Sequence, residues 1–162
     1  MKTERENKKE RSVCMDITAY LTTNRCFMKL HEHLIKEIAE SFEMTLMEAN
    51  IVSFLYNNPG KDTAADIVEL RMFSKGHVST AVEKLIQRGY LVRSEDRADR
   101  RRIHLSLLPA AEAMTERISQ AQVELLKEIF GGLSEEEWEL YEKVNQKVME
   151  RTLELTGRRK LK

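Results

Sequence analysis

The stretch Ser74–Arg93, SKGHVSTAVEKLIQRGYLVR, decides the fold of this 162-residue chain. Its apolar residues Val78, Val82 and Leu85 recur at the spacing of one helix face, and Gly89 follows as a C-terminal helix cap. A strand-like apolar run begins directly after that glycine. The stretch therefore predicts a helix that leads straight into a β-strand.

A second short helix is predicted just upstream. Either Asp62 or Thr63 is placed to cap its N-terminus, and Ile67, Val68 and Leu70 supply its apolar side. Only the three residues 72–74 separate this helix from the next, whose N-cap is Ser74. Two short helices joined by a tight break are typical of a helix-turn-helix.

A charged hairpin is predicted downstream. The runs YLVRSED (90–96) and RRIHLSLL (101–108) both read as strands, with a short turn at 97–100 between them. The segment 94–106 carries four arginines and two aspartates. The whole order predicts a fold that is mainly α with a small β-hairpin wing, a winged helix-turn-helix domain.

Long helices flank this domain. Residues 1–12 read as a mobile polar tail, 13–42 as an amphipathic helix, 43–108 as the winged domain, 109–157 as two further helices and 158–162 as a basic tail. Two capping boxes, Thr45 with Glu48 and Ser134 with Glu137, mark helix starts.

The composition limits the function classes. The formal net charge is zero, but residues 84–102 hold seven basic and three acidic side chains, whereas 112–154 hold five basic and eleven acidic ones. Such asymmetry favours one surface that meets a polyanion. No run of about 18 apolar residues or secretory signal is present, so we expect no membrane partner and a cytoplasmic location.

The second helix of a helix-turn-helix enters the DNA major groove. If its apolar stripe faces the core, the opposite side presents the residues predicted to bind DNA: Ser74, Lys75, Gly76, His77, Ser79, Thr80 and Lys84. Those near the N-terminus would reach base edges. Lys84 and Arg88 lie further along and are predicted to meet phosphate.

The wing is predicted to reach the backbone or the adjacent minor groove, where arginine is favoured. Its predicted DNA-binding residues are Arg97, Asp99, Arg100, Arg101 and Arg102. We hypothesise that Asp99 holds the guanidinium of Arg101, or that Asp96 holds that of Arg100.

Together, the segment SKGHVSTAVEKLIQRGYLVR and the wing DRADRRRIHLSLL resemble the MarR family of transcriptional regulators. The wing is similar to that family's Asp-x-x-Asp-Arg-Arg signature at Asp96, Asp99, Arg100 and Arg101. The order of the flanking helices also matches, so the resemblance covers nearly the whole chain. It implies a sequence-specific DNA-binding regulator, expected to be a repressor.

The resemblance further implies a homodimer, joined through its N- and C-terminal helices, that binds a palindromic operator. The long apolar stripes of those helices support this independently, because so small a winged domain cannot cover them. It also implies that a small apolar or phenolic ligand modulates DNA affinity. The residues Met28, Leu30, Leu34, Met44 and Met47 are candidates for lining its pocket, although such a stripe is more often plain core.

The chain departs from the family pattern at three places. Met72 occupies the break where the family usually has glycine, and Gly76 lies in the first turn of the recognition helix. After the second strand the chain reads LLPAAE instead of Leu-Thr-x-x-Gly. The departures at Met72 and Gly76 change which atoms the recognition helix can bring to the bases.

Alternatives remain open. The winged domain is also compatible with a protein-interaction module that binds no DNA. Cys14 and Cys26 suggest a second alternative, a regulator that senses oxidants through cysteine. Neither residue falls where the family's sensing cysteine lies. No nucleophile–base pair, phosphate loop or metal-ligand spacing is visible, so neither an enzyme, a cofactor nor a metal is expected.

Overall fold

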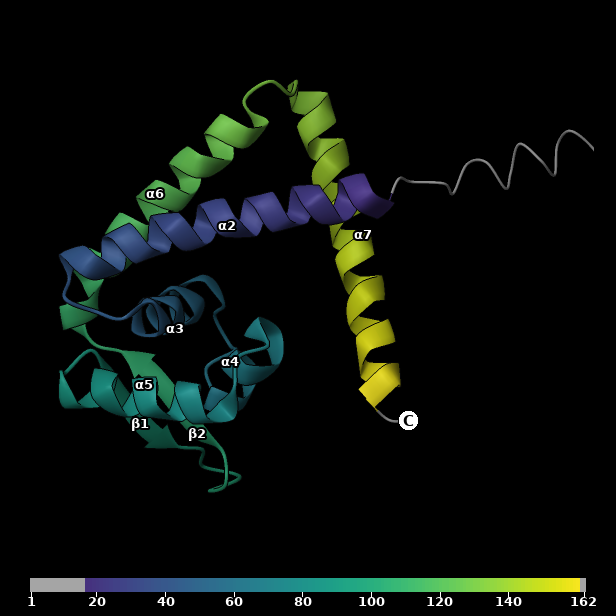
Figure 1. Ribbon diagram of the computed structural model, residues 1–162. Helices are drawn as coiled ribbons and strands as arrows, with labels where there is room; N and C mark the ends of the chain where they lie inside the picture. The colour runs from purple at the N-terminus through teal and green to yellow at the C-terminus, as the bar shows by residue number, and fades with distance from the viewer. Residues whose placement is uncertain (1–16, 161–162) are drawn as a thin grey trace, which may run out of the picture. The chain divides into compact units, whose positions relative to one another are not determined.

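Three helices and a hairpin form the winged domain. The computed structural model describes residues 17–160. Within them, α3 (Leu46–Asn57), α4 (Ala64–Arg71) and α5 (Lys75–Gln87) pack together, and the antiparallel strands β1 (Leu91–Glu95) and β2 (Ile103–Leu107) follow α5 (Figure 1). The prediction of a mainly α fold with a hairpin wing is confirmed.

The helix starts follow the predicted capping chemistry. The side chain of Thr45 accepts a hydrogen bond from the backbone N–H of Glu48, whose carboxylate accepts one from the N–H of Thr45. Thr63, the second of the two candidates, caps α4 in the same way with Asp66. These boxes satisfy N–H groups that a helix start otherwise leaves unpaired.

The hairpin is joined to the start of α4. In its register Leu91 pairs with Leu107 and Glu95 with Ile103. The backbone N–H of Leu105 donates to the carbonyl of Asp62 at 2.7 Å, beside an isolated bridge between Thr63 and His104. The wing is therefore attached to the helical part through the segment that precedes α4.

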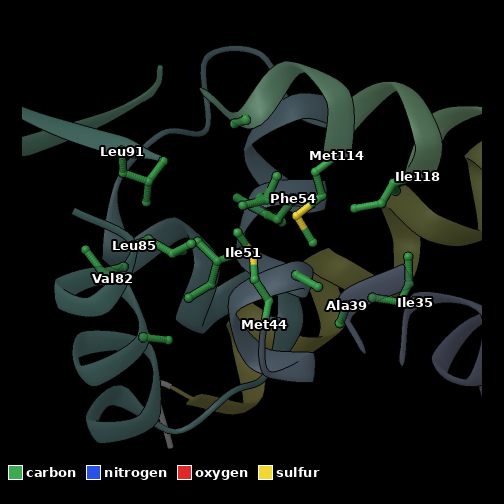
Figure 2. Packing of buried hydrophobic residues seen from close by; sticks show 14 of the residues in the cluster. Ile35, Ala39, Met44, Ile51, Phe54, Val82, Leu85, Leu91, Met114 and Ile118 are labelled. Carbon is green, nitrogen blue, oxygen red and sulfur yellow. The ribbon is translucent and has the colours of Figure 1, made fainter. Parts of the chain in front are cut away.

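The core lies beneath α5 and between α2 (Ile17–Ser41), α3 and the first turns of α6 (Glu112–Phe130). Ile35, Phe54, Leu85, Leu91 and Met114 are among its fully buried side chains, drawn from four helices and one strand (Figure 2). Burying side chains of this size contributes about 1.5–3 kcal/mol each. This core fixes which face of α5 remains outside.

Two residues that carry side chains, Glu43 and Met72, have positive φ angles, a backbone region that side chains disfavour. Met72 ends α4 at φ 54° and ψ 30°, in the left-handed region, and its side chain is 81% exposed. This is the position where the family usually has glycine, and glycine adopts that region without steric cost.

The chain divides into two units, residues 1–122 and 123–162, each of which is described by itself. The second unit contains the end of α6 and α7 (Glu135–Lys160), with the rings of Phe130, Trp138 and Tyr141 in mutual contact. Ser134 caps α7 as predicted.

Two bounds differ from the sequence prediction. The segment after the wing begins with a 3-10 turn, η1 (Pro109–Ala111), and becomes α-helical at Glu112. α7 continues to Lys160, into the segment predicted to be a basic tail. The predicted polar tail at 1–12 lies outside the described residues, as does the predicted helix start at 13.

Candidate nucleic-acid interface

The outer face of α5 carries the predicted recognition residues. Ser74 caps the helix by accepting a hydrogen bond from the backbone N–H of His77. Val78, Ala81, Val82 and Leu85 are buried on the inner side. All seven predicted recognition residues are exposed: Ser74, Lys75, Gly76, His77, Ser79, Thr80 and Lys84.

Gly76 leaves room at the start of this face. A Cβ built there would meet no described atom within 4 Å beyond its two chain neighbours and the nearby backbone of α5 itself. Packing within the protein therefore does not require glycine at this position. A bare backbone in the first turn of α5 permits a close approach by an external molecule.

A groove runs between α5 and the hairpin. It encloses about 800 Å³ and has Lys75 and Ser79 on the helix side and Arg93 and Glu95 on the strand side. The guanidinium of Arg93 also pairs with the carboxylate of Glu83 at 2.6 Å, which ties β1 to α5. The recognition face and the wing thus border one continuous surface.

The aspartates of the wing shape its backbone. One carboxylate oxygen of Asp96, Oδ1, accepts hydrogen bonds from the N–H groups of Ala98 (2.7 Å) and Asp99 (2.8 Å). Asp99 Oδ1 accepts one from the backbone N–H of Arg101 at 3.1 Å. The N–H of Arg102 donates to the carbonyl of Asp99 at 2.8 Å. Side chains that bond to nearby backbone in this way stabilise tight turns.

The hypothesis that these aspartates hold arginine guanidinium groups is therefore wrong. Their carboxylates are used on the backbone, because in so short a turn the N–H groups lie closer than the ends of the arginine side chains. The four arginines of the turn are exposed, and none forms an ion pair with another described residue: Arg97, Arg100, Arg101 and Arg102. Their donors remain available to an external anion.

A histidine completes the wing. His104 Nδ1 lies 2.8 Å from Asp62 Oδ1, and His104 Nε2 lies 3.0 Å from Asp96 Oδ2, while the histidine side chain is 24% exposed. The hydrogen bond to Asp62, followed by that to Asp96, raises the pKa of His104. The backbone N–H of Asp99, the His104 ring and the N–H of Ala98 lower the pKa of Asp96 to about 2.

Sequence reasoning missed this cluster. The strand at 101–108 was predicted from local patterning alone, whereas Asp62 lies 42 residues earlier in the chain than His104. Local patterning carries no signal for a pairing over that distance.

Arg88 lies at the C-terminal end of α5, as predicted, and is exposed. Its guanidinium donates hydrogen bonds to the carbonyls of Phe42 (3.1 Å) and Glu43 (3.0 Å) and lies 5.3 Å from the ring centroid of Tyr90. Two of its five N–H donors are thus used within the protein, and since Arg88 is exposed, contact with phosphate through the others stays a prediction. Arg88 also joins the end of α5 to the end of α2.

A smaller cavity of about 450 Å³ lies between α2, α3 and the α4–α5 connection. Met28 and Met47 line it, as do Glu32, Arg71 and Phe73. The guanidinium of Arg71 lies 5.7 Å from the centroid of the Phe54 ring, and burial lowers its pKa. No described carboxylate lies within 4 Å of it.

The cysteines, a metal site and a membrane-spanning helix were the other features considered from the sequence. Cys26 is a free, exposed thiol on α2, and Cys14 lies outside the described residues. Within residues 17–160, no three His, Cys, Asp or Glu side chains are grouped so as to hold a metal ion. None of the helices in that range is long and apolar enough to cross a bilayer.

The arrangement of two short helices, an exposed polar helix face and an arginine-rich hairpin matches known proteins. The model of the MarR family matches residues 42–102, the segment that holds α3 to the wing. Residues 42–102 of this chain are therefore similar to the winged-helix domain of the MarR family. This confirms the resemblance found in the sequence.

The HTH-type transcriptional regulator PrsX of Escherichia coli is 32% identical over 85 residues, which are 52% of this chain and 51% of that relative. The chain thus spans about half the length of the curated relative it matches.

Solved structures extend the likeness beyond the winged domain. The S. aureus MepR–DNA complex is 21% identical, with a TM-score of 0.62 over 82% of this chain and 97% of that one. BpsR of Bordetella bronchiseptica, whose DNA binding is regulated by 6-hydroxynicotinic acid, is 21% identical, with a TM-score of 0.58 over 81% and 98%. At these identities the likeness establishes the fold.

Proposed function

We propose that this protein is a cytoplasmic, sequence-specific DNA-binding transcriptional regulator that acts as a homodimeric repressor on a palindromic operator. The observation that carries the proposal is the surface formed by α5 and the wing. It combines an exposed polar helix face with four arginines that have no ion-pair partner among the described residues.

Each part of that surface suits a different part of DNA. Lys75, Ser79 and Thr80 lie near the N-terminus of α5 and would meet base edges in the major groove. The arginines of the turn would meet phosphates or the narrow minor groove, where their charge is attracted by the negative potential. MepR, which shares the fold, has been solved as a DNA complex.

The proposal of a dimer rests on apolar residues that the single chain leaves exposed. On α2 they include Ile17, Leu21 and Met28, which are 57–63% exposed. On α7, where none of the residues 135–157 is buried, they include Leu140, Val144 and Val148. Large exposed apolar patches mark interaction surfaces, and a two-fold partner would place two recognition helices about one DNA turn apart.

The experiment is fluorescence anisotropy with duplex DNA from upstream of the protein's own coding region, against a scrambled duplex, over a salt series. We expect a preference of about a thousandfold or more and a steep fall of affinity with salt. Arg100→Ala and Arg101→Ala should each reduce the salt slope by about one, because each removes one phosphate contact. Arg117→Ala, which removes an exposed arginine of α6, is the matched control. Equal, weak binding to both duplexes would favour the protein-interaction module instead.

We also propose that a small phenolic ligand modulates this DNA binding from the cavity beside α2. Arg71 offers a desolvated cation for an anionic group, and Glu32 offers an acceptor for a hydroxyl. The regulation of BpsR by a hydroxylated aromatic acid supports this class. By linkage, a ligand that weakens DNA binding is itself bound less tightly by the DNA complex.

The test is calorimetric titration with hydroxybenzoic and hydroxynicotinic acids. We expect binding that Arg71→Met abolishes and that Lys29→Met, which removes an exposed cation of α2 outside the cavity, leaves intact. Binding that survives Arg71→Met would place the ligand elsewhere.

A further inference from the structure

The His104 ring lies between two carboxylates that belong to different parts of the winged domain. Asp62 precedes α4, and Asp96 opens the wing turn. The two contacts, at 2.8 and 3.0 Å, use both ring nitrogens. The ring therefore bridges the helical part of the domain and the tip of the wing.

Both contacts require the imidazolium form. A neutral imidazole has one N–H donor and one acceptor nitrogen, and an ionised carboxylate only accepts. If the ring lost its proton, one nitrogen would face a carboxylate oxygen, lone pair against lone pair. Only the protonated ring donates to Asp62 and Asp96 together.

Deprotonation would release the wing without dissolving its turn. Asp96 Oδ1 would still accept from the N–H groups of Ala98 and Asp99, so the local turn would remain. What would be lost is a tie between the turn and the start of α4. Groups held in place before binding lose less freedom when they bind, so a looser wing binds phosphate more weakly.

We propose that His104, as an imidazolium, is a positioning residue that holds the arginine turn 97–102 against the start of α4, so that DNA affinity falls when this ring loses its proton. The inference rests on the proposed DNA-binding function. It assigns pH sensitivity to the wing, through a side chain that itself need not touch DNA.

The other charged groups around the ring have separate partners or act at longer range. Asp66 of α4 is hydrogen-bonded to Thr63, and the charges of Lys61 and Arg102 act on Asp66. On β1, the residue opposite His104 is the uncharged Ser94. The ring is thus governed mainly by Asp62 and Asp96.

The direction of the pH effect follows from the raised pKa of His104. The stabilisation is complete below about pH 6.5, the ordinary histidine value, and is lost as pH rises through the raised pKa. The lowered pKa of Asp96 matters only in acid. The stabilisation that its ionised carboxylate contributes is lost as pH falls toward about 2. Near neutrality, only the loss of the histidine proton changes the wing.

The first arm of the test uses DNA. Anisotropy with a mixed-sequence duplex of about 24 base pairs at low salt detects phosphate contacts without a known operator. Between pH 6 and 9 we expect affinity to fall about fivefold or more for the native protein, while His104→Gln stays flat and weak. His77 is also titratable and lies on the DNA-facing side of α5, so each variant is also measured in a His77→Gln background.

Asp62→Asn provides a second variant that leaves the ring in place. It removes the largest cause of the raised pKa, so the midpoint of the pH profile should move to lower pH. Glu95→Gln removes one exposed carboxylate of β1 that does not touch the ring, and its midpoint should match that of the native protein. Circular dichroism checks that each variant is folded.

The second arm uses NMR on the free protein. The His104 ring proton should titrate at higher pH than histidine in a short peptide, and Asp62→Asn should lower that midpoint. The inference is overturned if the ring titrates at the peptide value, or if His104→Gln keeps the native pH profile of DNA binding. If the native protein does not bind the mixed-sequence duplex at any pH, the proposed DNA-binding function itself has failed.

Discussion

Met72 gives a sharp prediction about stability. Its left-handed backbone costs a residue with a side chain about 1–2 kcal/mol. Replacing it with glycine removes that cost but loses about 0.5–1 kcal/mol through the greater freedom of the unfolded chain. Because the methionine side chain is 81% exposed, little packing is lost. We therefore expect Met72→Gly to raise the free energy of unfolding by about 0.5–1 kcal/mol.

Urea unfolding followed by circular dichroism measures this change. With a slope of about 2 kcal/mol per molar urea, the midpoint should rise by about 0.3–0.5 M. Protein concentration must be fixed, since a dimer's stability depends on it. Met72→Ala keeps the left-handed backbone and should leave the midpoint almost unchanged. A midpoint for Met72→Gly at or below the native value, or an equal rise in Met72→Ala, would refute the reasoning.

Three further predictions concern packing and assembly. Arg88→Met should lower the free energy of unfolding by about 1 kcal/mol, because the two carbonyls at the end of α2 lose their charged donor; urea unfolding measures this, and an unchanged midpoint would contradict it. Phe54→Ala should cost about 3–5 kcal/mol in the same assay, since the ring is 1% exposed; a loss below about 1 kcal/mol would argue against its place in the core. Val148→Asp should shift a dimer toward monomer in analytical ultracentrifugation, with Asn145→Asp on the same helix as the charge-matched comparison; an unshifted dimer would exclude Val148 from the interface.

The fold was predictable because its signals are local. Apolar spacing identified the helices, and capping boxes at Thr45 and Ser134 marked two helix starts that the structure confirms. Ser74 was likewise placed correctly as the cap of α5. Such features depend on residues three or four positions apart, so a single sequence displays them.

The site was only partly predictable. Some of its side chains bond to residues far away in the sequence, and others have more than one possible hydrogen-bond partner nearby. The exposed face of α5 followed from helical periodicity. The contact between Asp62 and His104 spans 42 residues, and that between Arg88 and Glu43 spans 45. In the wing, the aspartates could bond to arginine side chains or to backbone, and proximity favoured the backbone. Met72 is a case where local preference fails. The tight break between α4 and α5 imposes a left-handed backbone there, although a methionine disfavours it.

The most direct test of the central claim is selection from a random duplex library by the purified full-length protein, followed by sequencing. We predict enrichment of a two-fold symmetric motif whose half-sites lie about 10 base pairs apart, centre to centre. The combined Arg100→Ala and Arg101→Ala variant should enrich the same motif more weakly, because these side chains meet backbone. A pool that remains random after repeated rounds, at a salt concentration that suppresses non-specific binding, would contradict the account.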